Sequence, residues 1–280
     1  MKTLDIIKIG STFLKKNEIV SHILDSEILL SKTLKKTREE ILSNLDKKID
    51  KNNISIFKKY IERRSRNEPI AYILEEKEFW SKKFYVNTDT LIPRPETELL
   101  VDELLKIFKG KKINILDIGT GSGCIILSLL SVLKNSFGVG VDISKKAILV
   151  ANRNAFNHKI NQRVKFQTKS FKRIFNKKFD LIVSNPPYIK RTDMKNLSDD
   201  IRKYEPRMAL DGGNDGLDLI KKVIYKSKDI LKIKGTLALE IGNEQIKKVS
   251  KILIDNNFRI RSVVKDYKNN VRCVFAYYRG

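Results

Sequence analysis

The sequence predicts a two-domain α/β protein in which a small helical domain precedes a doubly wound, mostly parallel sheet. Over residues 4–66 apolar side chains recur at helical spacing, and signals for glycine turns, prolines and strands are nearly absent. From residue 113 onward, short apolar runs typical of strands alternate with helix-like stretches. We therefore expect a helical domain at 1–70, a β-hairpin linker at 71–93 and an α/β domain at 94–280.

The first domain is predicted to be a bundle of four or five short helices. Ile19, Ile23 and Ile28 illustrate the spacing that places apolar side chains on one helical face. Thr37 and Glu40 have the spacing of a capping box, which marks the start of a helix.

The linker is predicted from a change of composition. Residues 71–93 contain the β-favouring side chains Tyr72, Phe79, Trp80, Phe84, Tyr85 and Val86. A helix is then expected from about Glu96 to Phe108, with Pro95 near its first position, where a missing N–H costs nothing.

Seven strands are expected in the second domain, near residues 113–117, 137–141, 164–167, 179–183, 234–241, 258–264 and 271–278. Only residues 265–270 join the last two strands, which is too short for a crossover helix. Those two strands should therefore form an antiparallel hairpin.

A ligand site is predicted where the strand at 113–117 runs into Gly119-Thr120-Gly121-Ser122-Gly123 and then a helix-like stretch. This order of strand, glycine-rich turn and helix lets a backbone approach a ligand closely. The spacing fits neither the dinucleotide fingerprint nor a nucleotide triphosphate loop.

Two acidic residues are candidates for the same site. Asp142 ends the next strand, 23 residues after Gly119, where a carboxylate can accept both hydrogen bonds of a ribose diol. The alternative for Asp142 is a helix cap, although Ser144 is better placed for that role. Asp117 is either structural or reaches an amino group of the ligand.

A second site is predicted at Asn185-Pro186-Pro187-Tyr188, which ends the strand at 179–184. Paired prolines form a rigid turn without backbone donors, and the asparagine oxygen and a proline carbonyl can both accept from one planar NH2 group. The ring of Tyr188 offers a face to a flat conjugated group. We interpret the turn as a clamp for an amide or amino nitrogen, which needs a strong electrophile in line with it. The alternative is a Pro-Pro strand terminator with a packed tyrosine.

The combination resembles the S-adenosylmethionine-dependent methyltransferases, whose sulfonium methyl is such an electrophile. Five segments stand in the order typical of one family: RNEPIAYI at 66–73, EFW at 78–80, LIPRPETELLV at 91–101, NPPYI at 185–189 and EPRMALDGG at 205–213. Together they resemble the PrmC/HemK family, the N5-glutamine methyltransferases of peptide chain release factors, over nearly the whole chain.

The resemblance implies a Rossmann-like seven-stranded methyltransferase domain with S-adenosyl-L-methionine as cofactor and no metal. It places Gly119, Thr120, Gly121, Ser122, Gly123, Asp142 and Asn185 at the cofactor, and Asn185, Pro186, Pro187 and Tyr188 at the reacting glutamine. It also brings Arg94 and Glu96 near the pocket. Where the family commonly has an acidic residue near the adenine, this chain reads Lys169-Ser170-Phe171, so Ser170 or Phe171 is expected to replace it.

The composition bears on the partners and the location of the protein. The net charge is +24, with lysines spread along the whole chain rather than gathered in one segment. This favours compositional drift, with at most weak nonspecific contact with nucleic acid, although the charge could help the enzyme meet an acidic release factor. No membrane span or signal peptide is evident, so we expect a cytoplasmic protein. The resemblance implies that release factors 1 and 2 are its protein substrates. Cys124 and Cys273 are expected to be core residues.

Two rival functions and one local hypothesis stay open at this point. Adenine-N6 methyltransferases of nucleic acids use a similar Asn/Asp-Pro-Pro-aromatic turn, and the basic charge fits them. A cofactor-binding scaffold without activity is the second rival. The long polar segment 191–214 is predicted to be a loop with turns at Glu205-Pro206 and Asp211-Gly212-Gly213, and we expect it to receive the loop of the protein substrate.

Overall fold

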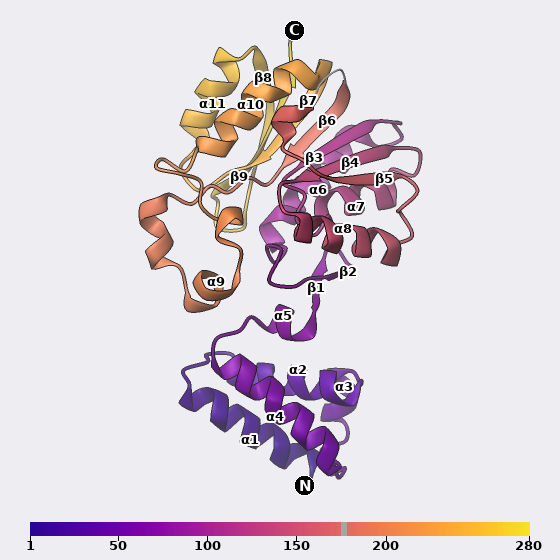
Figure 1. Cartoon of the computed structure of the whole chain (residues 1–280), viewed down its shortest axis with the longest axis vertical. Helices are drawn as coiled ribbons and strands as arrows, with labels where there is room; N and C mark the ends of the chain where they lie inside the picture. Colours follow the sequence, from indigo (N-terminus) through magenta and orange to yellow (C-terminus); the bar gives the residue numbers. More distant parts are fainter. Residues whose placement is uncertain (175–177) are drawn as a thin grey trace. The chain divides into compact units, whose positions relative to one another are not determined.

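The computed structural model describes residues 1–174 and 178–280, which form two compact units (Figure 1). The smaller unit comprises Met1–Glu76 together with Ser198–Tyr204. The larger unit comprises Lys77–Leu197 and Glu205–Gly280. The segment 198–204 is therefore separated in sequence from the unit with which it folds.

The smaller unit is a helical bundle, as predicted. Its N-terminal part contains α1 (Thr3–Lys16), α2 (His22–Leu34), α3 (Arg38–Leu42), α4 (Lys51–Ser65) and α5 (Ile70–Leu74). The capping box at α3 is confirmed, because the Thr37 side chain accepts from the Glu40 amide while the Glu40 carboxylate accepts from the Thr37 amide. The final helix of the unit, α9 (Asp199–Tyr204), is anchored by the Tyr204 hydroxyl, which donates to the Arg66 carbonyl at 3.0 Å.

The bundle is held by close packing and by one buried ion pair. A side-chain carbon at Gly10 would lie 2.6 Å from both Phe57 and Ser26, so the glycine allows α1 to approach α2 and α4. Arg64 Nε lies 2.7 Å from a carboxylate oxygen of Asp25, and both side chains are largely buried. Loss of either partner would leave a buried charge uncompensated.

The predicted hairpin exists as β1 (Glu76–Phe79) and β2 (Lys82–Tyr85). The predicted start of the hairpin linker is wrong, because residues 71–74, including Tyr72, belong to helix α5. Phe79 and Phe84 are completely buried in the core of the larger unit, so the hairpin is packed into that unit from Lys77 onward. The turn residues Trp80 and Ser81 have φ values of 49° and 54°, a conformation that glycine usually supplies.

The larger unit is built on a seven-stranded sheet with the strand order β5-β4-β3-β6-β7-β9-β8. The strands are β3 (Asn114–Ile118), β4 (Phe137–Asp142), β5 (Val164–Thr168), β6 (Phe179–Ser184), β7 (Leu231–Glu240), β8 (Phe258–Lys265) and β9 (Val271–Tyr278). The first five in that order are parallel, while β9 is antiparallel to both β7 and β8. The predicted C-terminal antiparallel hairpin is therefore confirmed.

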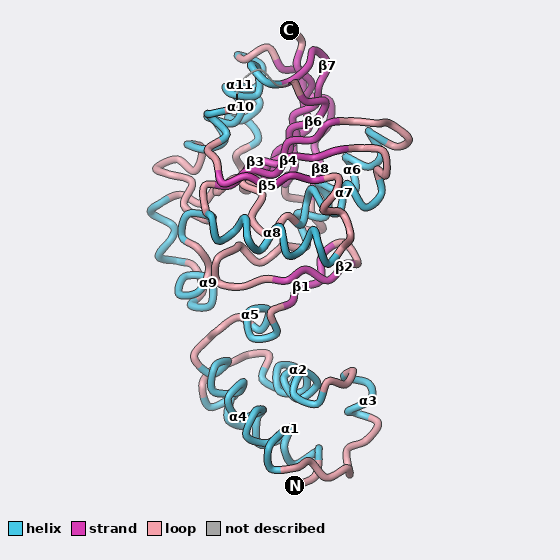
Figure 2. The backbone as a smooth tube through the Cα atoms, turned by 45° about the vertical axis from the view of Figure 1, so that its right-hand side comes forward, coloured by secondary structure: helices cyan, strands magenta, loops and turns pink. Residues whose placement is uncertain are grey.

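Helices cover both faces of this sheet (Figure 2). They are α6 (Pro95–Phe108), α7 (Cys124–Val132), α8 (Lys145–Asn157), α10 (Asp218–Ile230) and α11 (Ile246–Asp255). Pro95 occupies the first turn of α6, as predicted. The doubly wound architecture expected from the alternating sequence pattern is confirmed.

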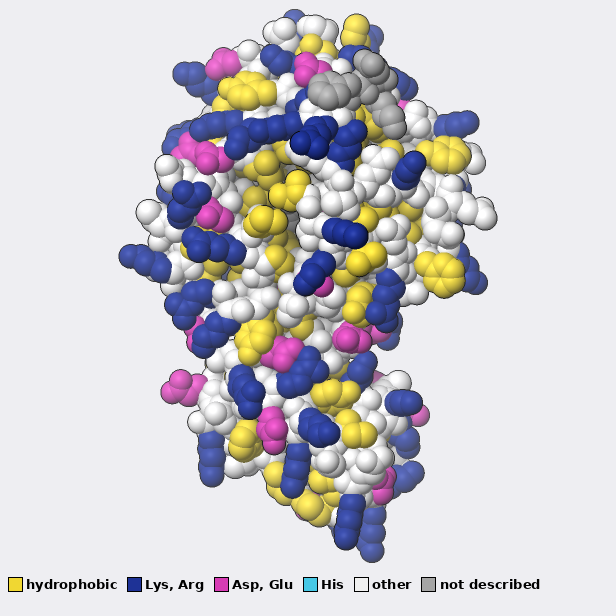
Figure 3. All heavy atoms as spheres, in the orientation of Figure 1, with side chains coloured by type: hydrophobic (Ala, Val, Ile, Leu, Met, Phe, Trp, Pro, Cys, Tyr) yellow, Lys and Arg dark blue, Asp and Glu magenta, His cyan; other side chains and the backbone are white. Residues whose placement is uncertain are grey.

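On the one face seen in Figure 3, basic side chains lie over many elements rather than on one. On the face shown in Figure 3, Lys and Arg side chains occur over both units, with fewer acidic ones between them. This distribution agrees with the spread of lysines along the sequence. None of the helices in the described ranges is long and apolar enough to cross a bilayer.

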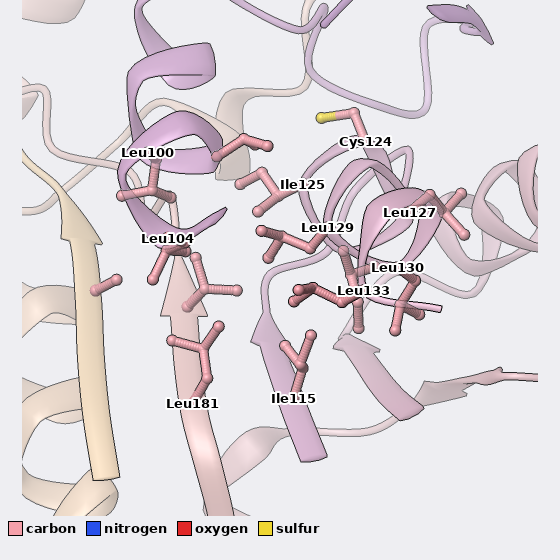
Figure 4. Close-up of a cluster of buried hydrophobic side chains, with 14 of the residues drawn as sticks. Leu100, Leu104, Ile115, Cys124, Ile125, Leu127, Leu129, Leu130, Leu133 and Leu181 are labelled. Atoms are coloured by element: carbon pink, nitrogen blue, oxygen red, sulfur yellow. The ribbon is translucent and has the colours of Figure 1, made fainter. Parts of the chain in front are cut away.

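Alternate residues of the central strands point into two separate cores. Ile115, Leu181 and Val183 pack in one cluster with side chains of α6 and α7. Figure 4 shows Ile115 and Leu181 in this cluster. Leu116 and Ile182 point to the opposite face and pack with side chains of α10 and α11. Burial on both faces explains why these strands read as continuous apolar runs.

Two regions differ from the sequence-based expectation. Strand β7 begins at Leu231, earlier than predicted, because Leu231 pairs with Phe179 before a register shift. The polar segment 191–214 is not a single loop: it contains α9 and the 3-10 turns Arg191–Asn196 and Arg207–Ala209. Short helical turns made of polar residues lack the apolar periodicity from which helices are predicted.

Candidate active site

The predicted site lies at the carboxyl ends of the central parallel strands. Ile118 at the end of β3 is in register with Val141 of β4 and with Ser184 of β6. The buried Ser184 hydroxyl donates to the Ile118 carbonyl at 2.7 Å, which ties the ends of β3 and β6 together. The glycine loop after β3 and the clamp after β6 are therefore neighbours, as expected for ligand sites in such sheets.

A cavity at this edge brings most of the predicted residues together. Its lining includes Gly119, Thr120, Gly121, Ser122, Asp142, Phe171, Asn185, Pro186 and Pro187. Further lining residues come from other segments and include Arg94, Thr97, Ile143, Lys169, Pro206 and Met208. The predicted residues Gly123, Ser170 and Tyr188 do not line it.

The glycine loop presents its backbone to the cavity. Gly119 and Gly121 have φ values of 71° and 54°, which most side chains adopt only with strain. A side-chain carbon added at Gly119 would meet no heavy atom within 4 Å, so the space beside this glycine is open. Gly123, with a φ of 80°, is the N-cap of α7 and closes the turn into that helix.

Asp142 stabilises the loop as well as lining the cavity. One carboxylate oxygen accepts from the Gly121 amide at 3.1 Å, and the other accepts from the Ser144 amide at 2.9 Å. Ser144, not Asp142, caps α8, because its hydroxyl accepts from the Ala147 amide at 3.1 Å. The helix-cap alternative for Asp142 is thus ruled out.

Asp117 lies beneath the loop and is completely buried. Its Oδ2 accepts from the Thr120 hydroxyl at 2.7 Å, whereas Oδ1 has no hydrogen-bond partner among the described residues. Burial, with a smaller contribution from the nearby charge of Asp142, raises the pKa of Asp117 to about 7. Because Asp117 does not line the cavity, the structure favours the structural alternative for this residue.

The burial of Asp117 makes stability depend on pH. The unfolded chain ionises this carboxyl near 3.8, but the folded protein does so only near 7, so stability is lost as the pH rises between these values. We expect Asp117→Asn to raise the unfolding temperature of the ligand-free protein by several degrees at about pH 8, and by little at about pH 4. The free-energy gain has an upper bound of roughly 4 kcal/mol. Calorimetric melting at both pH values measures it, and equal shifts at both would contradict this account.

Behind the clamp lies a hydrogen-bonded group that includes two residues from distant segments. Asn185 Nδ2 donates to Thr97 Oγ1 at 3.2 Å, and the Thr97 hydroxyl donates to Glu240 Oε2 at 2.6 Å. The Tyr188 hydroxyl donates to Glu240 Oε1 at 3.4 Å. Gln245 Nε2 donates to the Tyr188 carbonyl at 3.1 Å, so the backbone of the clamp is held as well.

Glu240 was not predicted as a site residue. It is 1% exposed at the end of β7, and burial raises its pKa to about 7. The sequence does contain a signal, because Glu240 is the only acidic residue in the apolar run 235–241, at the end of a predicted strand. A carboxyl group in that position lies at the same edge of the sheet as the clamp.

Arg94 and Glu96, which the resemblance brings near the pocket, differ in their position relative to the cavity. Arg94 lines the cavity and pairs with Glu205 at 2.6 Å, and a carboxylate oxygen of Glu205 also accepts from the Ile92 amide at 3.3 Å. These contacts join residues 92–94 to the segment that begins at Glu205. Glu96 does not line the cavity.

Two family descriptions match the chain. Residues 5–74 match the PrmC N-terminal domain, and residues 95–203 match the methyltransferase small domain. A release factor glutamine methyltransferase of Clostridium acetobutylicum is 37% identical, over 99% of this chain and 98% of the relative. The chain belongs to the release factor glutamine methyltransferase family. The resemblance drawn from the sequence segments is thereby confirmed.

Two further relatives are similar in sequence to this release factor glutamine methyltransferase family member. A protein of the same name from Fusobacterium nucleatum is 39% identical, over 98% of this chain and 78% of the relative. A bifunctional methyltransferase of Rickettsia conorii is 37% identical over 93% of the chain, but the match covers only 55% of that longer protein.

Solved structures support the fold of this family member. A methyltransferase from Pyrococcus furiosus has a TM-score of 0.55 at 18% identity, covering 78% of this chain and 99% of that one. A ribosomal protein L11 methylase from Lactobacillus delbrueckii has a TM-score of 0.51, covering 67% and 81%. The Rossmann-like methyltransferase fold is confirmed, and S-adenosylmethionine is the methyl donor of the family.

The cavity of this family member fits that cofactor chemically. The open backbone beside Gly119 can accept a close ligand, and the Asp142 carboxylate faces the cavity at the end of the neighbouring strand. Phe171 and Ile143 supply apolar surface beyond Asp142, where a flat base can lie. Cys124 also lines the cavity, but burial raises the pKa of its thiol to about 12, so it contributes no charge there.

Proposed function

We propose that this protein transfers a methyl group from S-adenosylmethionine to the side-chain amide nitrogen (N5) of the glutamine in the Gly-Gly-Gln motif of peptide chain release factors. The observation that carries the proposal is the joining of the glycine loop and the Asn185 clamp through the Ser184 to Ile118 hydrogen bond. This arrangement fixes an electrophile site beside a site with acceptors for an NH2 group. The membership of the release factor glutamine methyltransferase family specifies the substrate.

The clamp residues have distinct proposed roles. An amide nitrogen is a poor nucleophile because its lone pair is delocalised into the carbonyl group. Asn185 Oδ1 and the Pro186 carbonyl accept the two amide hydrogens, which orients the nitrogen and favours a pyramidal geometry. Pro187 keeps the turn rigid. Stacking of the Tyr188 ring on the amide plane stays a prediction, since its hydroxyl is turned toward Glu240.

The cofactor would be held by the other half of the cavity and supplies an electrophilic sulfonium methyl when bound. Gly119, Thr120, Gly121 and Ser122 contribute the loop surface, and Gly123 sets the start of the following helix. Asp142 is proposed to accept from the ribose hydroxyls. Phe171 is the better candidate for the adenine contact, because it lines the cavity and Ser170 does not. The methylated amide is acidic enough to lose its extra proton to solvent, so no strong base is required.

The helical unit is proposed to recognise the protein substrate. Its residues 5–74 match the PrmC N-terminal domain, which supports a role specific to this family. We propose functional limits of 1–70 for this domain and 94–280 for the catalytic domain, with segment 191–214 receiving the substrate loop. Release factors 1 and 2 are the proposed partners, the cytoplasm is the proposed location, and no requirement for nucleic acid is proposed.

A labelled-methyl assay tests the function. The protein is incubated with S-adenosylmethionine carrying a labelled methyl group and with unmethylated release factor 1 or 2, and the modified residue is located by mass spectrometry. We expect the label on the glutamine of the Gly-Gly-Gln motif, and none on a release factor in which that glutamine is replaced. Label on adenine in DNA or RNA controls, with none on release factors, would instead identify a nucleic-acid methyltransferase.

A further inference from the structure

The hydrogen bonds behind the clamp have a defined direction. Glu240 lies at the end of β7, Thr97 lies in the first turn of α6, and Asn185 follows β6. The Thr97 hydroxyl stands between the other two side chains, 2.6 Å from Glu240 Oε2 and 3.2 Å from Asn185 Nδ2. Thr97 and Glu240 are both buried.

The chemistry of these groups sets which end of the Asn185 carboxamide faces Thr97. An ionised carboxylate only accepts hydrogen bonds, so the single hydroxyl hydrogen of Thr97 points to Glu240. The Thr97 oxygen must then accept from its other neighbour, and only the NH2 end of Asn185 can donate. The carboxamide oxygen of Asn185 is consequently turned away from Thr97.

We propose that Thr97 and Glu240 are positioning residues that fix the orientation of the Asn185 carboxamide, so that its oxygen is presented to the substrate NH2 group. The proposal rests on the function proposed above, because an acceptor is useful there only for a substrate that brings donors. A carboxamide turned the other way would present its own NH2 group to the substrate, and two donors would face each other. Glu240 thus acts on the clamp without contacting the substrate.

The charge state of Glu240 is set by its surroundings. Arg272 on β9 lowers the pKa of Glu240, whereas Glu96 on α6 and above all burial raise it, to about 7. Cys124, Cys273 and Tyr188 also face Glu240, and burial raises the pKa of each, so they stay neutral near pH 7. A protonated Glu240 can donate to Thr97, which removes the constraint on Asn185.

A pair of substitutions at Thr97 tests the proposal. Thr97→Val removes the hydroxyl at nearly constant shape, while Thr97→Ser keeps it. We expect Thr97→Val to lower kcat on release factor by about tenfold or more, with the dissociation constant for S-adenosylmethionine changed less than about threefold, and Thr97→Ser to restore most of kcat. Thr236→Val, at a buried threonine elsewhere on β7, is the matched control and should leave kcat near normal.

The pH profile supplies a readout that a purely structural role would not change. At saturating cofactor and substrate, kcat of the unmodified protein should fall as the pH decreases from about 8 to about 6, because Glu240 takes up a proton. Glu240→Gln cannot titrate, so its kcat should be lower and nearly constant over this range. The side-chain amide signal of Asn185 in NMR spectra, assigned by its loss in Asn185→Ala, should shift over the same range and should stay constant in Thr97→Val.

The outcomes separate this inference from the proposed function. If the unmodified protein methylates the release factor but folded Thr97→Val retains normal kcat, the positioning role is wrong and the function stands. Failure of Thr97→Ser to restore kcat, or an Asn185 signal that does not respond to pH, also overturns the positioning role. If the unmodified protein does not methylate the release factor glutamine, both the function and the inference fall.

Discussion

Replacing Asn185 by alanine is expected to lower turnover on release factor by on the order of 10²–10³-fold, the range seen when one preorganised polar group at a reacting centre is removed. The substitution deletes the side-chain oxygen that is proposed to hold the substrate NH2 group. Affinity for S-adenosylmethionine should fall much less, since the glycine loop and Asp142 line the cavity independently of Asn185. Steady-state kinetics and calorimetric titration of the cofactor measure the two effects separately.

The matched control for this prediction is Asn161→Ala. Asn161 is exposed between α8 and β5 and is not among the residues that line the cavity. Its loss should leave both turnover and cofactor affinity unchanged. Turnover of Asn185→Ala within about threefold of normal would show that the clamp chemistry is wrong.

Replacing Asp142 by alanine is expected to weaken cofactor binding by about a hundredfold, because hydrogen bonds to a charged group are worth roughly 1.5–3 kcal/mol each. Two effects combine here. The proposed acceptor for the ribose hydroxyls is lost, and the amides of Gly121 and Ser144 lose the carboxylate to which they donate. The loop that faces the cofactor is therefore loosened at the same time.

Asp142→Asn separates the two effects. The amide oxygen of asparagine can still accept one of the backbone hydrogen bonds, so the loop should be better ordered than in Asp142→Ala. We expect an intermediate dissociation constant, measured by calorimetry with S-adenosylmethionine. Unchanged cofactor affinity in Asp142→Ala would contradict the assignment of this carboxylate to the ribose.

Much of the fold was predictable because local signals and tertiary structure agree in this chain. The apolar runs at β3 and β6 mark strands that are buried on both faces, and Pro95 and Thr37 stand at helix starts where their chemistry is favourable. The left-handed turn at Trp80 and Ser81 could not be predicted, because neither residue type favours that conformation. It is stabilised by contacts to α6, where Glu98 accepts from the Trp80 amide.

The site residues that lie in local sequence patterns were predictable, but the contact between Thr97 and Glu240 was not. Residues 119–122 of the glycine loop, Asp142 and Asn185 carry their chemistry in local sequence patterns and line the cavity, whereas the predicted Gly123, Ser170 and Tyr188 do not. Thr97 and Glu240 are 143 residues apart, and their contact exists only because α6 packs beside the end of β7. A local sequence pattern cannot predict this contact between distant residues. A single acidic residue in an apolar strand does indicate that its buried carboxyl group must have a hydrogen-bond or charge partner.

The hydrogen bond from Ser184 to Ile118 has a consequence for catalysis. Neighbouring strands in a sheet are about 4.8 Å apart, and this spacing cannot change without breaking the ladder between them. The proposed sites for the methyl donor and the acceptor follow the ends of two adjacent strands, β3 and β6, so the separation of these two sites is set by the sheet itself. Loop movements can then govern how fast the reactants enter and leave, while the in-line alignment that the proposed mechanism requires depends on a strand spacing that is set when the chain folds.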